Sequence, residues 1–266
     1  MEVFDWKEFL YPYEQAVNEL TVKFESLLNE YHTLGLYAPF ESVAGRVKSV
    51  SSILDKALRK NIPLDRLGTG MEDIAGIRIL CTFQEDIYKV RTLIQQRNNI
   101  DMTVLAERDY IENPKDSGYR SYHMIVRYPV NTVMGYREVR AEIQIRTLAM
   151  NFWAAAEHTL QYKYKGKIPH DLQRRLRLLA EAAYRLDDEM GSIRGEIMYA
   201  RHLNSLKNDL VAAIAGNLRN VRGNFSQEEL ERLQRDFLKS LAEGDMLGLK
   251  ALNDKLEEGS REELEL

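Results

Sequence analysis

The spacing of apolar residues divides the first half of the chain into helices and one strand. Over residues 6–31 apolar side chains recur every three or four positions, which predicts an amphipathic helix. The same spacing predicts a second helix over 41–60, ended by the segment 61–63 with its proline. A short run over 74–83 is rich in β-branched residues, as buried strands are. A third helix is predicted over 84–96.

The middle of the chain predicts a strand near 102–108 and then a β-hairpin. Residues 109–120 contain proline and glycine and are predicted to form a loop. Strands follow over 121–130 and 137–146. In the second of them apolar and polar side chains alternate, so one face is apolar and the other polar. Ordinary half-exposed strands alternate in the same way, so this pattern alone does not identify a site.

The last part of the chain is predicted to be helical, over 148–165, over 171–202 and beyond. On the long helix 171–202 the residues expected to face inward are Leu172, Leu176, Leu179, Ala183 and Leu186. Later helices should be broken at Gly216, at Gly223 and at Gly244, and a capping box is expected between Ser226 and Glu229.

This order of elements, with helices before and after four or five strands, gives the fold class α+β with a mixed sheet. Two domains are expected, a core over 1–202 and a helical, acidic extension over 203–266. Residues 1–202 hold 28 Lys and Arg against 28 Asp and Glu, whereas 203–266 hold 9 against 13. Because the core is neutral overall, any anion that it binds must be held by a local cluster of cations.

Composition excludes several classes of protein. The chain has 266 residues, 44% of them hydrophobic, and a single cysteine, Cys81, so a scaffold stapled by disulfides is excluded. No apolar run reaches the ~18 residues of a membrane helix, and the acidic N-terminal segment does not resemble a secretory signal. A cytoplasmic protein is expected.

The first candidate site is a row of cations in the segment 41–60. Spacings of three and four residues place most of them on one face of the predicted helix, as binding of a polyphosphate requires. A solvated helix face is the alternative, but such faces usually carry both signs of charge, and acids are scarce here. The residues of this row are Arg46, Lys48, Ser52, Lys56 and Arg59.

The second candidate is an acidic pair beside a buried strand. Glu72 and Asp73 precede Ile74, and a carboxylate in this position can hold Mg²⁺ together with phosphate oxygens. Asp73 and Arg78 differ in strand parity, so either Asp73 lies before the strand or Gly76 marks a bulge. Taken alone, an aspartate here is more often a turn residue.

The third candidate is the loop over 115–123, with the sequence KDSGYRSYH. It supplies cations for phosphates, a glycine that permits close approach, and tyrosine rings on which a base can stack. An ordinary hairpin turn is the alternative. The fourth candidate is the polar face of the last strand, with Glu142, Gln144 and Arg146.

Other chemistries lack sequence support. The chain has no Walker A motif, no dinucleotide-binding glycine pattern and no Gly-x-Ser-x-Gly elbow. Its five histidines are scattered without a pair at metal-ligand spacing. Cys81 lies inside an apolar run and is expected to be a packed thiol.

Five segments, in order, resemble the synthetase domain of the RelA/SpoT homologue family: GRVKSVSSILDK, EDIAGIRI, DSGYRSYH, EIQIRT and MNFWAAAEH. Together with WKEFLYPYEQAVNEL they are most similar to the single-domain small alarmone synthetases of Firmicutes, over about residues 5–200. The resemblance implies a nucleotidyltransferase fold related to polymerase β. It also implies that the β,γ-diphosphate of ATP moves to the 3′-hydroxyl of GDP or GTP, which yields ppGpp or pppGpp and AMP.

The resemblance implies roles by motif position. Arg46 and Arg78 are expected to sandwich the adenine of ATP. The ATP phosphates are then expected to be held by Lys48, Ser52, Lys56 and Arg59. Asp73 and Glu142 are expected to hold Mg²⁺, and Glu142 to activate the 3′-hydroxyl. The residues expected to bind GDP or GTP are Lys115, Tyr119, His123 and Gln144, with Tyr119 stacked on the guanine.

The resemblance also implies a homotetramer. Relatives that are activated by pppGpp use basic and aromatic residues where this chain has Thr21, Glu25 and Ser42, although Asn151 remains. These departures argue against activation by pppGpp and against binding of single-stranded RNA. Alternatives that stay open are a synthetase that prefers GMP, one that makes an adenosine alarmone or modifies tRNA, and an inactive nucleotide- or RNA-binding regulator.

Overall fold

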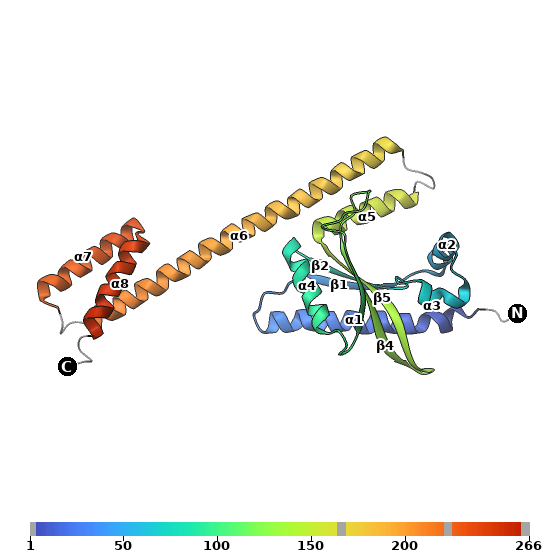
Figure 1. Cartoon of the computed structure of the whole chain (residues 1–266), viewed down its shortest axis with the longest axis horizontal. Helices are drawn as coiled ribbons and strands as arrows, with labels where there is room; N and C mark the ends of the chain where they lie inside the picture. Colours follow the sequence, from blue (N-terminus) through green and yellow to red (C-terminus); the bar gives the residue numbers. More distant parts are fainter. Residues whose placement is uncertain (1–3, 164–168, 221–224, 262–266) are drawn as a thin grey trace. The chain divides into compact units, whose positions relative to one another are not determined.

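A mixed five-stranded sheet organises the N-terminal part of the protein, in a computed structural model that describes residues 4–163, 169–220 and 225–261 (Figure 1). The strand order is β1-β2-β5-β4-β3, and only β2 and β5 among neighbouring strands are parallel. The α+β class with a mixed sheet is therefore confirmed. The strands are β1 Ser42–Val47, β2 Ala75–Cys81, β3 Thr103–Asp109, β4 Tyr122–Thr132 and β5 Gly135–Thr147.

The back face of this sheet carries the hydrophobic core. Alternate residues of the central strands, such as Ile77, Met124 and Ile143, are fully buried. They pack against α1 Trp6–Thr33 and α4 Gln84–Gln96, which belong to the same apolar cluster. Gly45 lets α1 approach β1, because a Cβ there would lie 2.5 Å from side-chain atoms of α1.

The helix predicted over 41–60 is wrong in its first part, because residues 42–47 form β1 and the helix α2 spans Val50–Lys60. Val43 and Val47 are four positions apart, a spacing that suits both a helical face and one face of a strand. Two local signals favour the observed structure. Gly45 destabilises a helix interior, and Ser49 caps α2 by accepting a hydrogen bond from the backbone N–H of Ser52.

The other predicted elements of the sheet domain are confirmed, with ends that differ by a few residues. Asp73 lies before β2, and the register of β2 with both neighbours is continuous through Gly76, so no bulge is present there. A short helical turn η1 Leu64–Arg66 and α3 Leu67–Gly70 connect α2 to β2. After β5 the chain forms α5 Leu148–Lys163.

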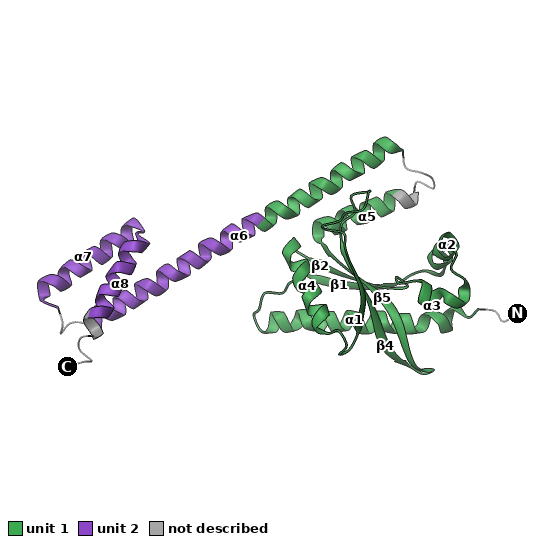
Figure 2. Ribbon diagram, in the orientation of Figure 1, with its two compact units in different colours: residues 1–191 green, residues 192–266 purple. Residues whose placement is uncertain are grey.

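Helix α6 spans His170–Asn220, and the boundary between two compact units, Met1–Gly191 and Ser192–Leu266, falls inside it (Figure 2). The boundary predicted at 202 also falls within this helix. Gly216 does not break α6, so that prediction is wrong, and Gly223 lies outside the described residues.

The second unit has a small core of its own, formed where the end of α6 packs with α7 Gln227–Glu243 and α8 Met246–Arg261. The predicted capping box of Ser226 and Glu229 is present, and Gly244 ends α7 with a φ of 71°. The buried residues of this core are Ile214, Leu233, Leu249, Leu252 and Leu256.

The inward face predicted for α6 is confirmed in part. Leu172, Leu176 and Ala183 are half-buried, and the last two pack against a cluster that contains Trp153 and Ala180. Leu179 and Leu186 were also predicted to face inward but are 59% and 57% exposed. Within the described residues, no helix is long and apolar enough to cross a membrane.

Candidate functional site

The front face of the sheet gathers polar side chains from four strands. Register pairs Arg78 of β2 with Gln144 of β5, Gln144 with His123 of β4, and His123 with Arg108 of β3. Paired residues point to the same face of a sheet, so these four side chains form one row. Glu142 lies in the next row, beside Gly76.

A cavity of about 180 Å³ opens over these rows, at the end of the face nearest β1 and β2. Two small residues, Ala44 and Gly76, leave room above the strands. The charged and amide side chains that line the cavity are Arg46, Lys48, Asp73, Arg78, Glu142 and Gln144.

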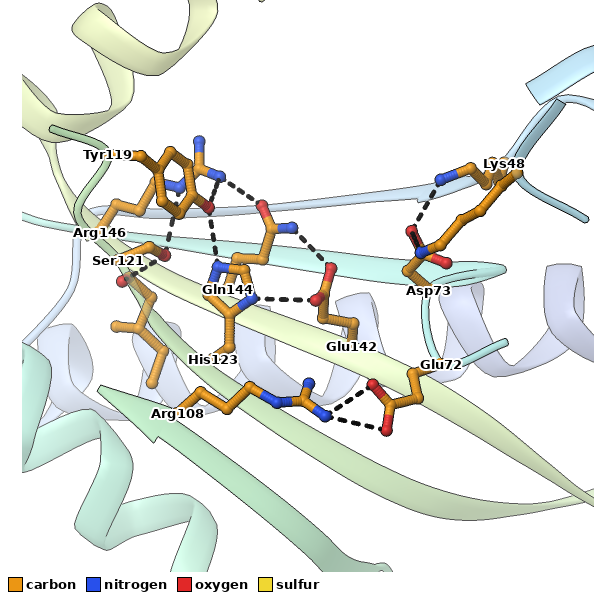
Figure 3. A network of polar contacts seen from close by, with 12 residues as sticks. Lys48, Glu72, Asp73, Arg108, Tyr119, Ser121, His123, Glu142, Gln144 and Arg146 are labelled. Atoms are coloured by element: carbon orange, nitrogen blue, oxygen red, sulfur yellow. Dashed lines mark hydrogen bonds and ion pairs between the residues drawn. The ribbon is translucent and has the colours of Figure 1, made fainter. Parts of the chain in front are cut away.

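Asp73 is held at the cavity by two lysines. Lys48 Nζ and Lys56 Nζ each lie 2.7 Å from Asp73 Oδ2 (Lys48 and Asp73 are labelled in Figure 3). Burial favours the neutral acid, but the hydrogen bonds and charges of the two lysines outweigh it and hold the pKa of Asp73 below its ordinary value. Helix α2 begins two residues after Lys48, and a helix N-terminus favours anions.

Glu142 accepts a hydrogen bond on each carboxylate oxygen. His123 Nδ1 lies 2.9 Å from Oε1, and Gln144 Nε2 donates to Oε2 at 2.7 Å. Burial opposes ionisation, and the charge of Asp73 also raises the pKa, but the bonds from His123 and Gln144 keep the pKa of Glu142 below its ordinary value. Glu142 is therefore ionised at neutral pH, and His123 must carry its proton on Nδ1 to donate to it.

Three arginines face the cavity and its margin. Burial, followed by the positive charges of Arg146 and Arg46, lowers the pKa of Arg78. Arg78 Nε is buried and has no hydrogen-bond partner among the described residues. Such a concentration of guanidinium groups suits a ligand that is anionic or has an aromatic ring.

The predicted loop over 115–123 borders the same network. Tyr119 Oη lies 2.7 Å from His123 Nε2, and Lys115 Nζ lies 4.8 Å from the centre of the Tyr119 ring. Gly118 has a φ of 88°, and a Cβ there would lie 2.6 Å from Ala180 of α6. Helix α6 thus packs directly on this loop, which only a glycine permits.

The structure brings most of the predicted site residues together, but not all of them. Six of the predicted residues line the cavity: Arg46, Lys48, Asp73, Arg78, Glu142 and Gln144. Lys56 reaches it through its ion pair with Asp73, and His123 links Tyr119 to Glu142. Ser52 and Arg59 are exposed on α2 and do not line the cavity. The hydroxyl of Ser52 accepts a hydrogen bond from Ser49 at 2.9 Å.

Sequence reasoning missed two pairings at the site. It assigned no lysine partners to Asp73, and it did not pair Arg108 with Glu72, whose carboxylate lies 2.9 Å from Arg108 Nη2 (Figure 3). Strand parity did place Arg146 on the face of Glu142 and Gln144, but without a specific role.

A divalent cation fits Asp73. In the described part of the chain no group of three or more His, Cys, Asp or Glu residues forms a ready-made metal cluster. Asp73 Oδ1 is nonetheless buried without a hydrogen-bond partner there, and a free carboxylate oxygen is the donor that Mg²⁺ prefers. Glu142 lines the same cavity and is the second carboxylate available.

Comparison with known proteins gives consistent matches. The family model described as a region found in RelA/SpoT proteins matches residues 45–167. The GTP pyrophosphokinase YjbM of Bacillus subtilis is 53% identical over 196 residues, which are 74% of this chain and 92% of that protein. The GTP pyrophosphokinase YwaC of the same organism is 40% identical over 195 residues, 73% of this chain and 92% of that protein.

Solved structures agree. The crystal structure of small alarmone synthetase 1 from Bacillus subtilis bound to its product pppGpp has a TM-score of 0.69 and 53% identity, and the match covers 72% of this chain and 97% of that one. A GTP pyrophosphokinase family protein from Streptococcus pneumoniae has a TM-score of 0.70 and 45% identity, with 75% and 97% covered.

Proposed function

The chain belongs to the RelA/SpoT family, and we propose that within it the protein is a GTP pyrophosphokinase that makes ppGpp or pppGpp. It transfers the β,γ-diphosphate of ATP to the 3′-hydroxyl of GDP or GTP and releases AMP. The observation that carries this proposal is the placement of an ionised, hydrogen-bonded Glu142 on the same cavity as Asp73 and the cations of Arg46, Lys48 and Arg78.

Glu142 is suited to act as the general base. Its two oxygens are held by His123 and Gln144, so it is ionised and fixed in direction before a substrate arrives. In the reaction the 3′-hydroxyl gives its proton to Glu142, its oxygen bonds to the β-phosphorus of ATP, and the bond from that phosphorus to the bridging α–β oxygen breaks. AMP leaves with that oxygen.

The cations supply charge compensation for the transferred diphosphate. Lys48 and Lys56 converge on one oxygen of Asp73, and we assign the ATP phosphates to them and to Ser52 and Arg59 further along α2. We assign the adenine to Arg46 and Arg78, whose guanidinium planes can stack on a base.

We assign Mg²⁺ to Asp73 and Glu142. The free, buried Oδ1 of Asp73 supports this assignment. When bound, the ion would neutralise charge on the phosphate oxygens as the diphosphate is transferred. A binding readout tests the site without turnover: Mn²⁺ should bind the wild-type protein, as followed by electron paramagnetic resonance, and bind at least about tenfold more weakly to Asp73→Asn.

The acceptor nucleotide is assigned to the loop beside Glu142. Tyr119 offers a ring for the guanine. Lys115 and His123 lie beside this ring, and Gln144 lies beside the general base Glu142. A single histidine, His123, separates the Tyr119 ring from the carboxylate of Glu142. A guanine stacked on this ring would therefore place its ribose near Glu142.

We further propose a homotetramer in the cytoplasm. The exposed apolar side chains of Leu179 and Leu186 on α6 support association with other copies, because a monomer gains nothing from leaving them in water. The single buried thiol of Cys81 is compatible with a reducing compartment. Binding of single-stranded RNA is not part of the proposal.

A substrate panel tests the proposed function. Purified protein is incubated with γ-labelled ATP, Mg²⁺ and, separately, GMP, GDP, GTP or tRNA, and the products are resolved. We expect labelled guanosine tetra- or pentaphosphate from GDP and GTP. Label found only with GMP or tRNA would change the acceptor, and no labelled product with any acceptor would favour a regulator without synthetase activity.

A further inference from the structure

Arg146 lies at the junction of the two chains of hydrogen bonds that reach Glu142. Its side chain comes from β5, is only 5% exposed, and closes a ring with four neighbours (Figure 3). Arg146 Nη2 donates to Gln144 Oε1 at 2.7 Å and to Tyr119 Oη at 2.5 Å. From these two residues the ring continues through Gln144 on one side and His123 on the other to the same carboxylate.

We propose that Arg146 is a positioning residue that sets the direction of both hydrogen bonds to the general base Glu142. This inference rests on the proposed function and deepens it, because it names the group that orients the acceptor-binding side chains. It assigns Arg146 no contact with the substrate.

The first arm acts through the amide of Gln144. An amide side chain has one accepting end and one donating end, whereas a guanidinium only donates. The side-chain oxygen of Gln144 must therefore face Arg146, and its NH₂ group faces Glu142 Oε2. The ionised Glu142, which only accepts, favours the same orientation, so loss of Arg146 removes one of the two groups that hold the amide.

The second arm acts through Tyr119 and His123. The hydroxyl oxygen of Tyr119 accepts a hydrogen bond from Arg146, so its own proton is free to be donated to His123 Nε2. That leaves the proton of a neutral His123 on Nδ1, where it is donated to Glu142 Oε1. Each arm thus delivers one N–H group to a different oxygen of the Glu142 carboxylate.

The surroundings of Arg146 are adapted to hold its guanidinium in one orientation. Its Nε donates to Ser121 Oγ at 3.3 Å, and that hydroxyl donates to the backbone oxygen of Ile145. Its Cζ lies 5.0 Å from the centre of the Tyr119 ring. Among the described residues Arg146 forms no ion pair with a carboxylate. A buried charge held only by neutral acceptors lowers stability, which points to a role in the site.

Kinetics of matched variants test the proposal. Arg146→Met removes the donors and keeps a long side chain, Arg146→Lys restores a charge and some of the donors, and Arg127→Met is the control. Arg127 is an exposed arginine of β4 that pairs in register with Arg140, on the same sheet face but outside the ring. We expect Arg146→Met to lower kcat for synthesis ~10- to 100-fold, with the KM for ATP within about twofold. Arg146→Lys should recover part of the loss, and Arg127→Met should match the wild type.

The kinetics of the two Arg146 variants decide the proposal together. A wild-type kcat in Arg146→Met, or an equal loss of kcat in Arg146→Met and Arg146→Lys, would overturn it.

¹⁵N NMR of the His123 side chain tests the same proposal without turnover. In the wild type the ¹⁵N shifts of His123, assigned with a His123→Gln variant, should show the proton on Nδ1. In Arg146→Met both tautomers should appear. Unchanged shifts in Arg146→Met would refute the positioning role even if the protein made no alarmone, whereas a silent wild type in the substrate panel would refute only the proposed function.

Discussion

The two faces of the same five strands follow different rules. On the back face Ile77, Met124 and Ile143 are almost completely buried and belong to the apolar core. On the front face Glu142 and His123 belong to a closed network of hydrogen bonds beside a cavity. Alternate residues of one strand, β5, thus serve both faces.

This difference separates stability from chemistry. Burial of apolar groups on the back face stabilises the fold by about 1.5–3 kcal/mol for each large side chain. The front face places charged groups together at a cost in desolvation, which their hydrogen bonds and ion pairs offset. A substitution on the front face should therefore mainly change turnover, and a substitution on the back face should mainly change the free energy of unfolding.

The largest effect is expected from Glu142→Gln on the front face. The amide keeps the shape of the side chain but cannot accept the proton of the 3′-hydroxyl, so kcat should fall by about 10³-fold or more. Binding of an ATP analogue, followed by titration calorimetry, should change little. A near-normal kcat would remove Glu142 from the role of base.

The counterpart on the back face is Ile143→Ala, one residue along the same strand. Ile143 is fully buried, so the cavity left behind should lower the free energy of unfolding by about 3 kcal/mol in urea titrations. The kcat of the folded protein should stay within a few-fold of the wild type. A loss of turnover without a loss of stability would contradict the division between the faces.

Asp187 of α6 is a buried acid outside the hydrogen-bond network around Glu142. Thr147, at the end of β5, donates to Asp187 Oδ2 at 2.6 Å, and burial raises the pKa of Asp187 from 3.8 to about 6. Because the folded pKa is raised, ionisation destabilises the fold, and stability is lost as the pH rises from about 4 through 6.

Asp187→Asn should therefore stabilise the protein at pH 8, by up to about 3 kcal/mol, and have little effect at pH 4. Urea titrations of both proteins at the two pH values measure this. A destabilised variant at pH 8 would show that the carboxylate contributes more as a partner of Thr147 than it costs as a buried charge.

The smallest effect is expected from Tyr119→Ala. Loss of the ring removes a stacking surface worth about 1–3 kcal/mol per base, so the KM for GDP or GTP should rise by about tenfold or more. Some loss of kcat should accompany it, because Tyr119 also links Arg146 to His123. The KM for ATP serves as the internal control. A KM for ATP that rose as much as that for GDP would show that the loop does not select the acceptor.

Most of the sheet could be predicted from the sequence because β2 is a short run rich in β-branched residues and β5 alternates apolar and polar side chains, patterns that favour strands. β1 could not be separated from a helix by spacing alone, since Val43 and Val47 fit both, and only Gly45 and the cap at Ser49 distinguish them. The inward face of α6 was predicted only in part, for a similar reason. Leucines at neighbouring positions of a helix fit the same spacing, and the packing of Ala180 against Gly118 leaves Leu179 and Leu186 exposed.

The site residues were predictable as a set, but not their partners. The sequence places Asp73 before β2 and Glu142 on the polar face of β5, and the register brings both to one cavity. The pairing of Asp73 with both lysines depends on how α2 leaves β1, which was predicted as one continuous helix. The ring through Arg146 requires side-chain directions that periodicity does not provide.

The stoichiometry of the products tests the central claim most directly. With ATP labelled in both the adenine and the γ-phosphate, and GDP as acceptor, we predict one molecule of AMP for each labelled guanosine tetraphosphate, and a labelled diphosphate at the 3′ position. Formation of ADP with transfer of a single phosphate, or AMP with the label released as free pyrophosphate, would contradict the account.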